Sequence, residues 1–265
     1  MQFAFETRHA TRHAMTPVRE PYECAGARGF RYGEVPRAIE NALPRWIAAE
    51  RCDGVEELKP GRVWRVGEHV VKLSKPDGAI DTWLRASSAV RAADMHARVL
   101  PVRSPSPSLA LERRIGRRLT ASWLIAEFIA GEHLQRAWKD DPAARATLPS
   151  FMALMHSHKV LHGDLNPRNL IWTGKQWVLI DLEGVRRGLQ VLRARRMFEN
   201  QWARIVAAVR DEDAVQPAFV EYAHVTTASG DATAAWQRVV RRSRIIVAGY
   251  DEKLRARGRI DAPGR

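Results

Sequence analysis

The segment from residue 162 to 184, HGDLNPRNLIWTGKQWVLIDLEG, constrains this chain more than any other feature. Within it, Asp164 is followed five residues later by Asn169, and Asp181 comes directly after the apolar run 177–180. Another apolar run follows the asparagine, and the four residues between the two runs include a glycine, which predicts a β-hairpin with a tight turn. The hairpin would carry Asn169 and Asp181 toward the same place.

Two carboxylates and an amide at this spacing fit phosphoryl transfer from a nucleoside triphosphate. In that reaction a loop aspartate accepts the hydrogen of the attacking hydroxyl, and magnesium neutralises the phosphate charge. Asp164 and Asn169 are therefore the predicted catalytic residues, and Asn169 and Asp181 are the predicted magnesium ligands. Each residue taken singly is explained equally well by a helix cap or a turn. Their joint order, which matches the kinase catalytic-loop and metal motifs, indicates catalysis.

Lys72 supplies the expected contact with the nucleotide. It lies in the second arm of a predicted hairpin, 62–66 and 69–73, joined through Gly67-Glu68. Its apolar neighbours predict a buried strand, and binding the α- and β-phosphates of ATP would explain a lysine there. The alternative is an edge-strand lysine that faces solvent.

Two further segments are predicted to contact the nucleotide. Upstream of the hairpin, Lys59 and Gly61 lie where a phosphate-covering loop would be, although there is one glycine in place of the three of G-x-G-x-x-G. Contact there would come from the Gly61 amide and the charge of Lys59 or Arg62. Downstream, the backbone of Ala126-Glu127-Phe128-Ile129 is predicted to face adenine.

Protein kinases orient this strand lysine with a glutamate on the following helix. No glutamate occurs between Lys72 and Glu112, and Asp94 is the nearest carboxylate on the predicted helix. Asp94 either replaces the glutamate or forms a surface pair with Arg91 or Arg98.

The chain has 265 residues, 45% of them apolar, enough for one large domain or two lobes. Its formal net charge of +13 comes mostly from arginine, since seven of the 43 basic residues are lysines. Such a surface favours phosphate-bearing partners. The alternative is that the excess of arginine reflects the codon composition of the genome.

Cys24 and Cys52 fit neither a zinc site nor a disulfide framework and indicate a reducing compartment. Without a long apolar run or a hydrophobic signal region, a cytoplasmic protein is expected.

The expected organisation is an α+β fold with two lobes. Residues 1–50 are predicted to be a basic, partly ordered extension, 51–130 a β-rich nucleotide-binding N-lobe, 131–254 a mainly helical C-lobe and 255–265 a polar tail. Ala130-Gly131 is the candidate hinge. The other predicted elements are a helix at 81–100, a Pro/Ser loop at 101–107, a strand at 121–129, a helix start at Asp141-Pro142 interrupted by Pro149, and helices at 150–158, around 198–209 and at 236–250.

With Lys72, HGDLNPRN and IDLEG in this order, the chain resembles the lipopolysaccharide kinase family, which includes Kdo and heptose kinases. The resemblance covers about residues 55–209 and extends to VWRVGEHVVKL, LPVRSPSP and LIAEFIAGEHL. It implies a protein-kinase-like fold, ATP and magnesium as cofactors, and a carbohydrate or glycolipid acceptor. It also implies peripheral contact with the anionic inner membrane. By the same match Asp164 is the base, Asn169 and Asp181 hold magnesium, and Lys72 binds phosphates.

The sequence argues against a protein substrate. Gly163 stands in place of the arginine of H-R-D, Asn166 replaces the lysine two residues after the aspartate, and no A-P-E segment follows Asp181. A small or lipid-linked hydroxyl acceptor fits better. Five arginines could hold an anionic acceptor or form a solvated basic face: Arg186, Arg187, Arg193, Arg195 and Arg196.

Three other interpretations remain. An aminoglycoside-type small-molecule phosphotransferase shares H-G-D-x-x-x-x-N, but only about thirty residues here separate Gly131 from His162. A pseudokinase or binding scaffold would explain the missing helix glutamate. Nucleic-acid binding is not expected, since no aromatic-rich or zinc-spaced module accompanies the charge.

Overall fold

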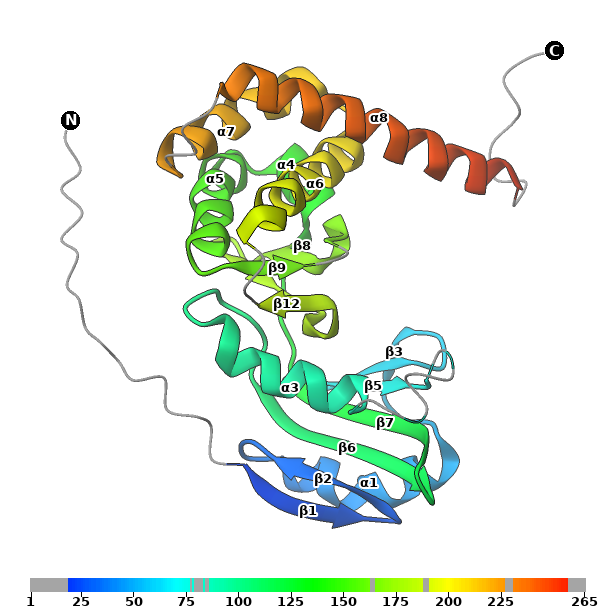
Figure 1. Ribbon diagram of the computed structural model, residues 1–265. Helices are drawn as coiled ribbons and strands as arrows, with labels where there is room; N and C mark the ends of the chain where they lie inside the picture. Colours follow the sequence, from blue (N-terminus) through cyan, green and yellow to red (C-terminus); the bar gives the residue numbers. More distant parts are fainter. Residues whose placement is uncertain are drawn as a thin grey trace.

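The computed structural model describes residues 19–76, 78, 83, 86–162, 165–187, 191–226 and 231–256, apart from the side chains of 186–187 and 191–195. These residues form a β-rich N-lobe and a mainly helical C-lobe (Figure 1). The predicted two-lobed α+β architecture is confirmed.

The N-lobe is built on one antiparallel sheet of seven strands, in the order β1-β2-β6-β7-β5-β4-β3. The strands are β1 (Glu20–Cys24), β2 (Ala27–Arg31), β3 (Glu56–Lys59), β4 (Val63–Val66), β5 (His69–Ser74), β6 (Pro107–Ile115) and β7 (Arg118–Glu127). The predicted hairpin is confirmed as β4 and β5, with Lys72 opposite Val63. On its other side Lys72 pairs with Leu124 of β7, so it lies on an interior strand and is not an edge-strand residue.

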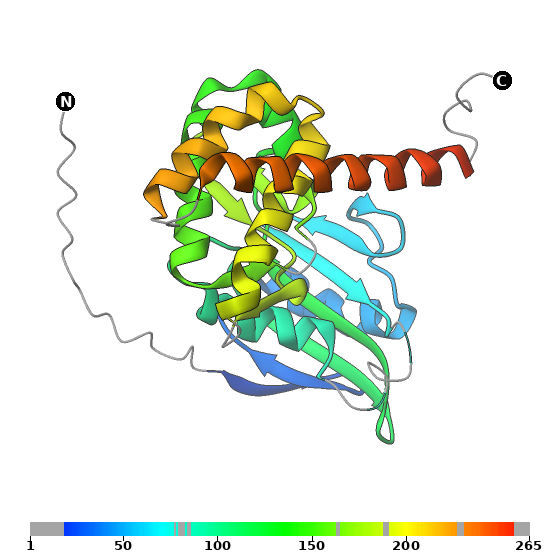
Figure 2. The same cartoon turned by 45° about the horizontal axis from the view of Figure 1, so that its top comes forward.

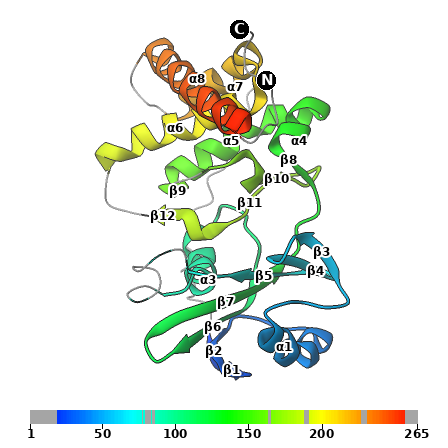
Figure 3. The same ribbon diagram turned by 90° about the vertical axis from the view of Figure 1, so that its right-hand side faces the viewer.

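Helices cover both faces of this sheet (Figure 3). Helix α1 (Arg37–Ala49) packs on one face, where Leu109 and Leu111 of β6 join its core. Helix α3 (Ser88–Val99) packs on the other, against Ala110 of the same strand. This alternation is what a strand with two buried faces requires. The Ser87 hydroxyl caps α3 by accepting from Val90 N at 3.3 Å, so the described helix begins later than the predicted one.

The prediction that residues 1–50 form a separate extension is wrong from residue 20 onward. Strand β2 pairs with β6, with Arg31 opposite Leu109. Helix α1 contributes Ile39 and Ile47 to the N-lobe core, and neither has any exposed surface. The basic composition was misleading because Arg31 is neutralised by Glu40 at 2.6 Å within the lobe.

In the described residues, the C-lobe combines helices with short strands. The helices are α4 (Leu134–Asp140), α5 (Pro142–Ser157), α6 (Val191–Val209), α7 (Glu212–Val225) and α8 (Ala232–Ala256). The strands are β8 (Glu132–His133), β9 (Val160–His162), β10 (Leu170–Trp172), β11 (Trp177–Leu179) and β12 (Val185–Arg187), with short 3-10 helices η1 (Pro167–Asn169) and η2 (Leu182–Gly184). Helix α8 crosses the lobe and projects beyond it (Figure 2).

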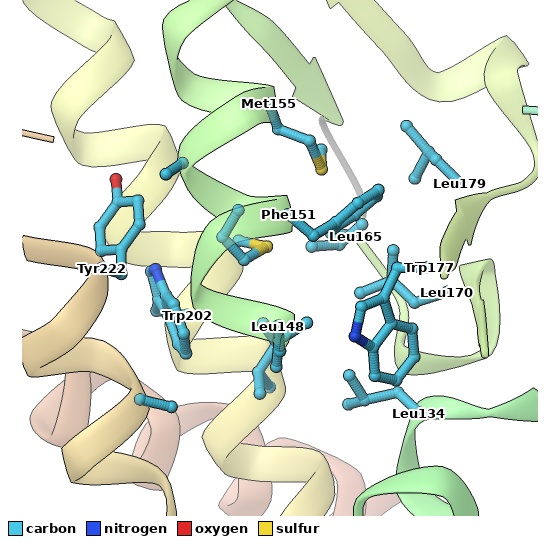
Figure 4. Packing of buried hydrophobic residues seen from close by; sticks show 14 of the residues in the cluster. Leu134, Leu148, Phe151, Met155, Leu165, Leu170, Trp177, Leu179, Trp202 and Tyr222 are labelled. Atoms are coloured by element: carbon cyan, nitrogen blue, oxygen red, sulfur yellow. The ribbon is translucent and has the colours of Figure 1, made fainter. Parts of the chain in front are cut away.

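The helix start at Asp141-Pro142 is confirmed, since the Asp141 carboxylate accepts from Ala143 N at 2.8 Å. The expected interruption at Pro149 is wrong, because α5 runs through it. A proline inside a helix removes one backbone hydrogen bond. Burial of Leu148, which lies in the C-lobe core (Figure 4), and of Met152 offsets that loss, since neither has exposed surface.

The two lobes meet at the chain segment that follows β7. The predicted hinge residue Gly131 has a φ of +155°. A Cβ atom at this position would lie 2.2 Å from the carbonyl oxygen of Trp172, so only glycine fits. None of the described helices combines the length and apolar composition that a membrane span requires.

Candidate active site

The predicted hairpin after the catalytic loop is confirmed as β10 and β11, with Leu170 opposite Leu179. Just before the hairpin, Asn169 accepts a backbone hydrogen bond from Ile180 N at 2.9 Å. The chain then continues into β12, which pairs with β9 so that Val185 lies opposite His162. These pairings bring Asn169 next to the residue before Asp181, as the sequence predicted.

His162 connects these two predicted magnesium ligands. Its Nε2 lies 3.1 Å from the backbone carbonyl oxygen of Asp181 and 3.5 Å from Asn169 Nδ2. Asp181 itself is in the left-handed region, with φ 61° and ψ 52°, a conformation that is uncommon for non-glycine residues but is adopted more often by aspartate than by most. A Cβ atom at Gly184 would lie 3.0 Å from the His162 ring, so the glycine allows this close packing.

Lys72 crosses from the N-lobe to this loop. Its Nζ lies 2.6 Å from Asp181 Oδ1 and 2.8 Å from Glu183 Oε1. The lysine and Glu183 side chains are each 29% exposed. The structure thus joins Lys72 and Asp181 and adds Glu183, which the sequence analysis did not identify. The signal was present, since Glu183 is an acid two residues after Asp181 in a chain that lacks the helix glutamate.

This ion pair raises the pKa of Lys72 and lowers the pKa of Asp181. Burial tends to lower the pKa of Lys72, but the charges of Asp181 and Glu183 outweigh it, so the pKa of the lysine is raised. Burial tends to raise the pKa of Asp181, yet the charge of Lys72 outweighs burial and lowers it from its ordinary value. Both groups are therefore charged at neutral pH.

Asp94 does not replace the missing helix glutamate, contrary to the first of the two interpretations above. Its carboxylate accepts from the Tyr32 hydroxyl at 2.8 Å and from Arg19 at 3.1 Å. The alternative surface pair with Arg91 or Arg98 is not found among the described residues either. Asp94 instead ties α3 to the N-terminal strands.

A cavity of about 260 Å³ surrounds the Lys72–Asp181 pair. Besides these two residues and Glu183, four basic side chains line it. They are Lys59, Arg62, Lys75 and Arg91. Five bases facing two acids leave an excess of positive charge, which fits the phosphate groups of a nucleotide.

The other predicted nucleotide contacts are placed differently. The Gly61 amide donates to Glu57 Oε1 at 2.7 Å, so the expected phosphate contact of that amide is taken up by a carboxylate. The Glu127 amide donates to Ser106 O and the Phe128 amide to Glu68 O, each at 2.9 Å. Of the residues predicted to face adenine, Ile129 is the one whose N–H makes no hydrogen bond to any residue in the described part of the chain.

The donor set fits magnesium. Mg²⁺ prefers oxygen ligands and is usually held by one or two carboxylates together with substrate phosphates. Asp181 offers a carboxylate and Asn169 an amide oxygen. Among the described residues no cluster of three or more His, Cys, Asp or Glu side chains forms a protein-only metal cage.

Asp164 lies outside the described residues, as do the side chains of Arg186, Arg187, Arg193 and Arg195.

A family model described as the phosphotransferase enzyme family matches residues 40–222. A search of curated proteins found no match. Among solved structures, WaaP in complex with acyl carrier protein is 14% identical, with a TM-score of 0.48 over 84% of this chain and 97% of that one. The bifunctional kinase-methyltransferase WbdD is 12% identical, with a TM-score of 0.43 over 69% of this chain and 42% of that one.

Proposed function

The chain belongs to the phosphotransferase enzyme family, and from this premise we propose that it transfers the γ-phosphate of ATP to a hydroxyl of a lipopolysaccharide inner-core sugar or a similar carbohydrate. The observation that carries the proposal is the contact between Lys72 and Asp181, made across the two lobes in a cavity with excess positive charge. The sequence resemblance to lipopolysaccharide kinases supports the choice of acceptor.

Each residue has a defined task in this reaction. Lys72 binds the α- and β-phosphates, and Lys59 and Arg62 add charge from the neighbouring turn. Asp164 takes the proton of the acceptor hydroxyl. The hydroxyl oxygen bonds to the γ-phosphorus, and the bond between the γ-phosphorus and the β–γ bridging oxygen breaks. Asn169 and Asp181 would hold magnesium, which would neutralise charge on the phosphates. The products are the phosphorylated sugar and ADP.

The experiment that tests this function is mass spectrometry of cell-envelope glycolipids from cells with and without the protein. Glycolipids from cells lacking it should be one phosphate lighter, and wild-type protein should restore the mass. The Asp164→Asn variant should bind ATP but fail to restore it, because it lacks the base. Unchanged glycolipids with transfer to soluble aminoglycosides would favour a small-molecule phosphotransferase. Absence of ATP turnover with every acceptor would favour a scaffold.

A groove between α6 and α8 supports an anionic acceptor. It has a volume of about 510 Å³, and four of its lining residues are arginines: Arg196, Arg238, Arg241 and Arg242. Arg238 is paired with Glu199 at 2.8 Å, whereas no carboxylate within the described part of the chain pairs with the other three. Helix α6 also reaches the catalytic loop, since Gln201 Nε2 donates to His162 O at 3.3 Å. The groove could therefore hold a phosphate-bearing acceptor.

Reversing two charges in the groove, Arg241→Glu with Arg242→Glu, should raise the KM for a phosphorylated glycolipid about tenfold and leave the KM for ATP unchanged. The matched control is Arg117→Glu with Arg118→Glu. It changes the net charge equally at the exposed turn between β6 and β7. Equal effects of both double variants would show that only overall charge matters and would remove the groove from the proposal.

A further inference from the structure

Lys72 has two carboxylate partners, and both come from the three-residue segment Asp181-Leu182-Glu183. Asp181 Oδ1 is 2.6 Å from the lysine nitrogen and Glu183 Oε1 is 2.8 Å from it. Helix α3, which would carry the orienting glutamate in a protein kinase, contains one acidic residue. That residue, Asp94, is bound to Arg19 and Tyr32.

Magnesium binding would weaken the first of these two contacts. A carboxylate that coordinates Mg²⁺ shares its negative charge with the metal, so Asp181 would hold the lysine less strongly once the metal is bound. Glu183 would then be the stronger carboxylate partner of the partly buried Lys72. Glu183 is close enough to hold it in place.

The backbone around Glu183 is fixed well enough for this task. Leu182 is 5% exposed and belongs to the C-lobe core together with Ala92 of α3. Val185 pairs with His162 on the following strand. The side chain of Glu183 therefore starts from a rigid position, between the core on one side and the lysine on the other.

We infer that Glu183 is the positioning residue for Lys72, and that it performs from the metal-binding loop the task that a helix glutamate performs in protein kinases. This inference rests on the proposed function, because it assigns Glu183 a role toward the same ATP. It also removes the main support for the scaffold interpretation, since the missing helix glutamate has a substitute.

The test compares Glu183→Gln with Asp94→Asn, which removes the same charge from α3. For both variants and the wild type, the dissociation constant of a non-hydrolysable ATP analogue and kcat are measured at saturating Mg²⁺. The Mg²⁺ concentration at half-maximal rate is measured in a separate Mg²⁺ titration. Glu183→Gln should weaken analogue binding about tenfold and lower kcat, with the Mg²⁺ midpoint unchanged. Glu183→Asp, which keeps the charge, should restore part of the loss. Asp94→Asn should bind the analogue as the wild type does.

Three results would overturn the inference. Wild-type binding by Glu183→Gln would show that Asp181 alone holds the lysine. A higher Mg²⁺ midpoint with unchanged analogue binding would make Glu183 a metal ligand. Loss of analogue binding in Asp94→Asn but not in Glu183→Gln would assign the positioning of Lys72 to Asp94 of α3. A wild-type protein that binds no ATP analogue would instead refute the proposed function, and this inference with it.

Discussion

Asp181→Asn is expected to lower the rate of phosphate transfer by roughly a thousandfold or more, because it removes the carboxylate that we propose holds magnesium, 2.6 Å from Lys72 Nζ. The fold should survive. The Asp181 side chain is 36% exposed, and a pair of this exposure contributes at most about 1 kcal/mol. Transfer of label from γ-labelled ATP measures the rate, and thermal unfolding checks the fold.

The pKa of Asp181 sets the pH range of this comparison. Burial tends to raise that pKa, but the charge of Lys72 outweighs burial and lowers it from its ordinary value, so the carboxylate is ionised at neutral pH. Its contribution to stability is present above the pKa of an unpaired aspartate and is lost as the pH falls through the lowered pKa. The two proteins should therefore be compared between pH 6 and pH 8. The control is Asp140→Asn, an exposed carboxylate 3.6 Å from Arg136, which should keep full activity. Wild-type turnover by Asp181→Asn would exclude the magnesium-assisted mechanism.

Trp202→Ala is expected to lower the free energy of unfolding by about 3–5 kcal/mol, the range for a buried aromatic residue replaced by alanine. Trp202 of α6 has no exposed surface, and its ring lies 5.3 Å from that of Tyr222 (Figure 4). The ring of Phe219 lies 5.6 Å from that of Trp202. The substitution would leave a cavity where α6 meets α7. Denaturant unfolding followed by circular dichroism measures the loss.

Trp202→Phe is the matched control. It keeps an aromatic ring in the cluster and removes an indole N–H that is buried without a hydrogen-bond partner. The expected cost is below about 1.5 kcal/mol, since the change in volume is small and no hydrogen bond is lost. Similar unfolding curves for the alanine variant and the wild type would show that this cluster does not stabilise the C-lobe.

The sequence predicted the parts of the fold that local pattern determines. The β4–β5 and β10–β11 hairpins each have alternating or apolar arms around a glycine-containing turn, and both are found where expected. The position of Asp181 after β11 follows from the second hairpin. Lys72 was assigned to a buried strand from its neighbours alone, and pairing on both sides of β5 confirms this.

The elements that were missed depend on contacts between distant segments. Strand β6 begins with proline and serine and contains Glu112 and Arg113, so it lacks a clear apolar pattern; it is stabilised by β2 and β7 on either side. Helix α1 contains Pro44, yet its buried face is held by the N-lobe core. Glu183 was missed for a similar reason, because its contact with Lys72 joins residues 111 positions apart.

The location of the Lys72 ion pairs has a consequence for inhibition. The lysine belongs to the N-lobe, and both of its partners belong to the C-lobe. Separation of the two lobes about Gly131 would therefore move Lys72 away from Asp181, so the lysine that binds the phosphates and the carboxylate proposed to bind magnesium would no longer face each other. A compound that holds the lobes apart would therefore weaken ATP binding without occupying the adenine position, and ATP would weaken binding of the compound by the same factor.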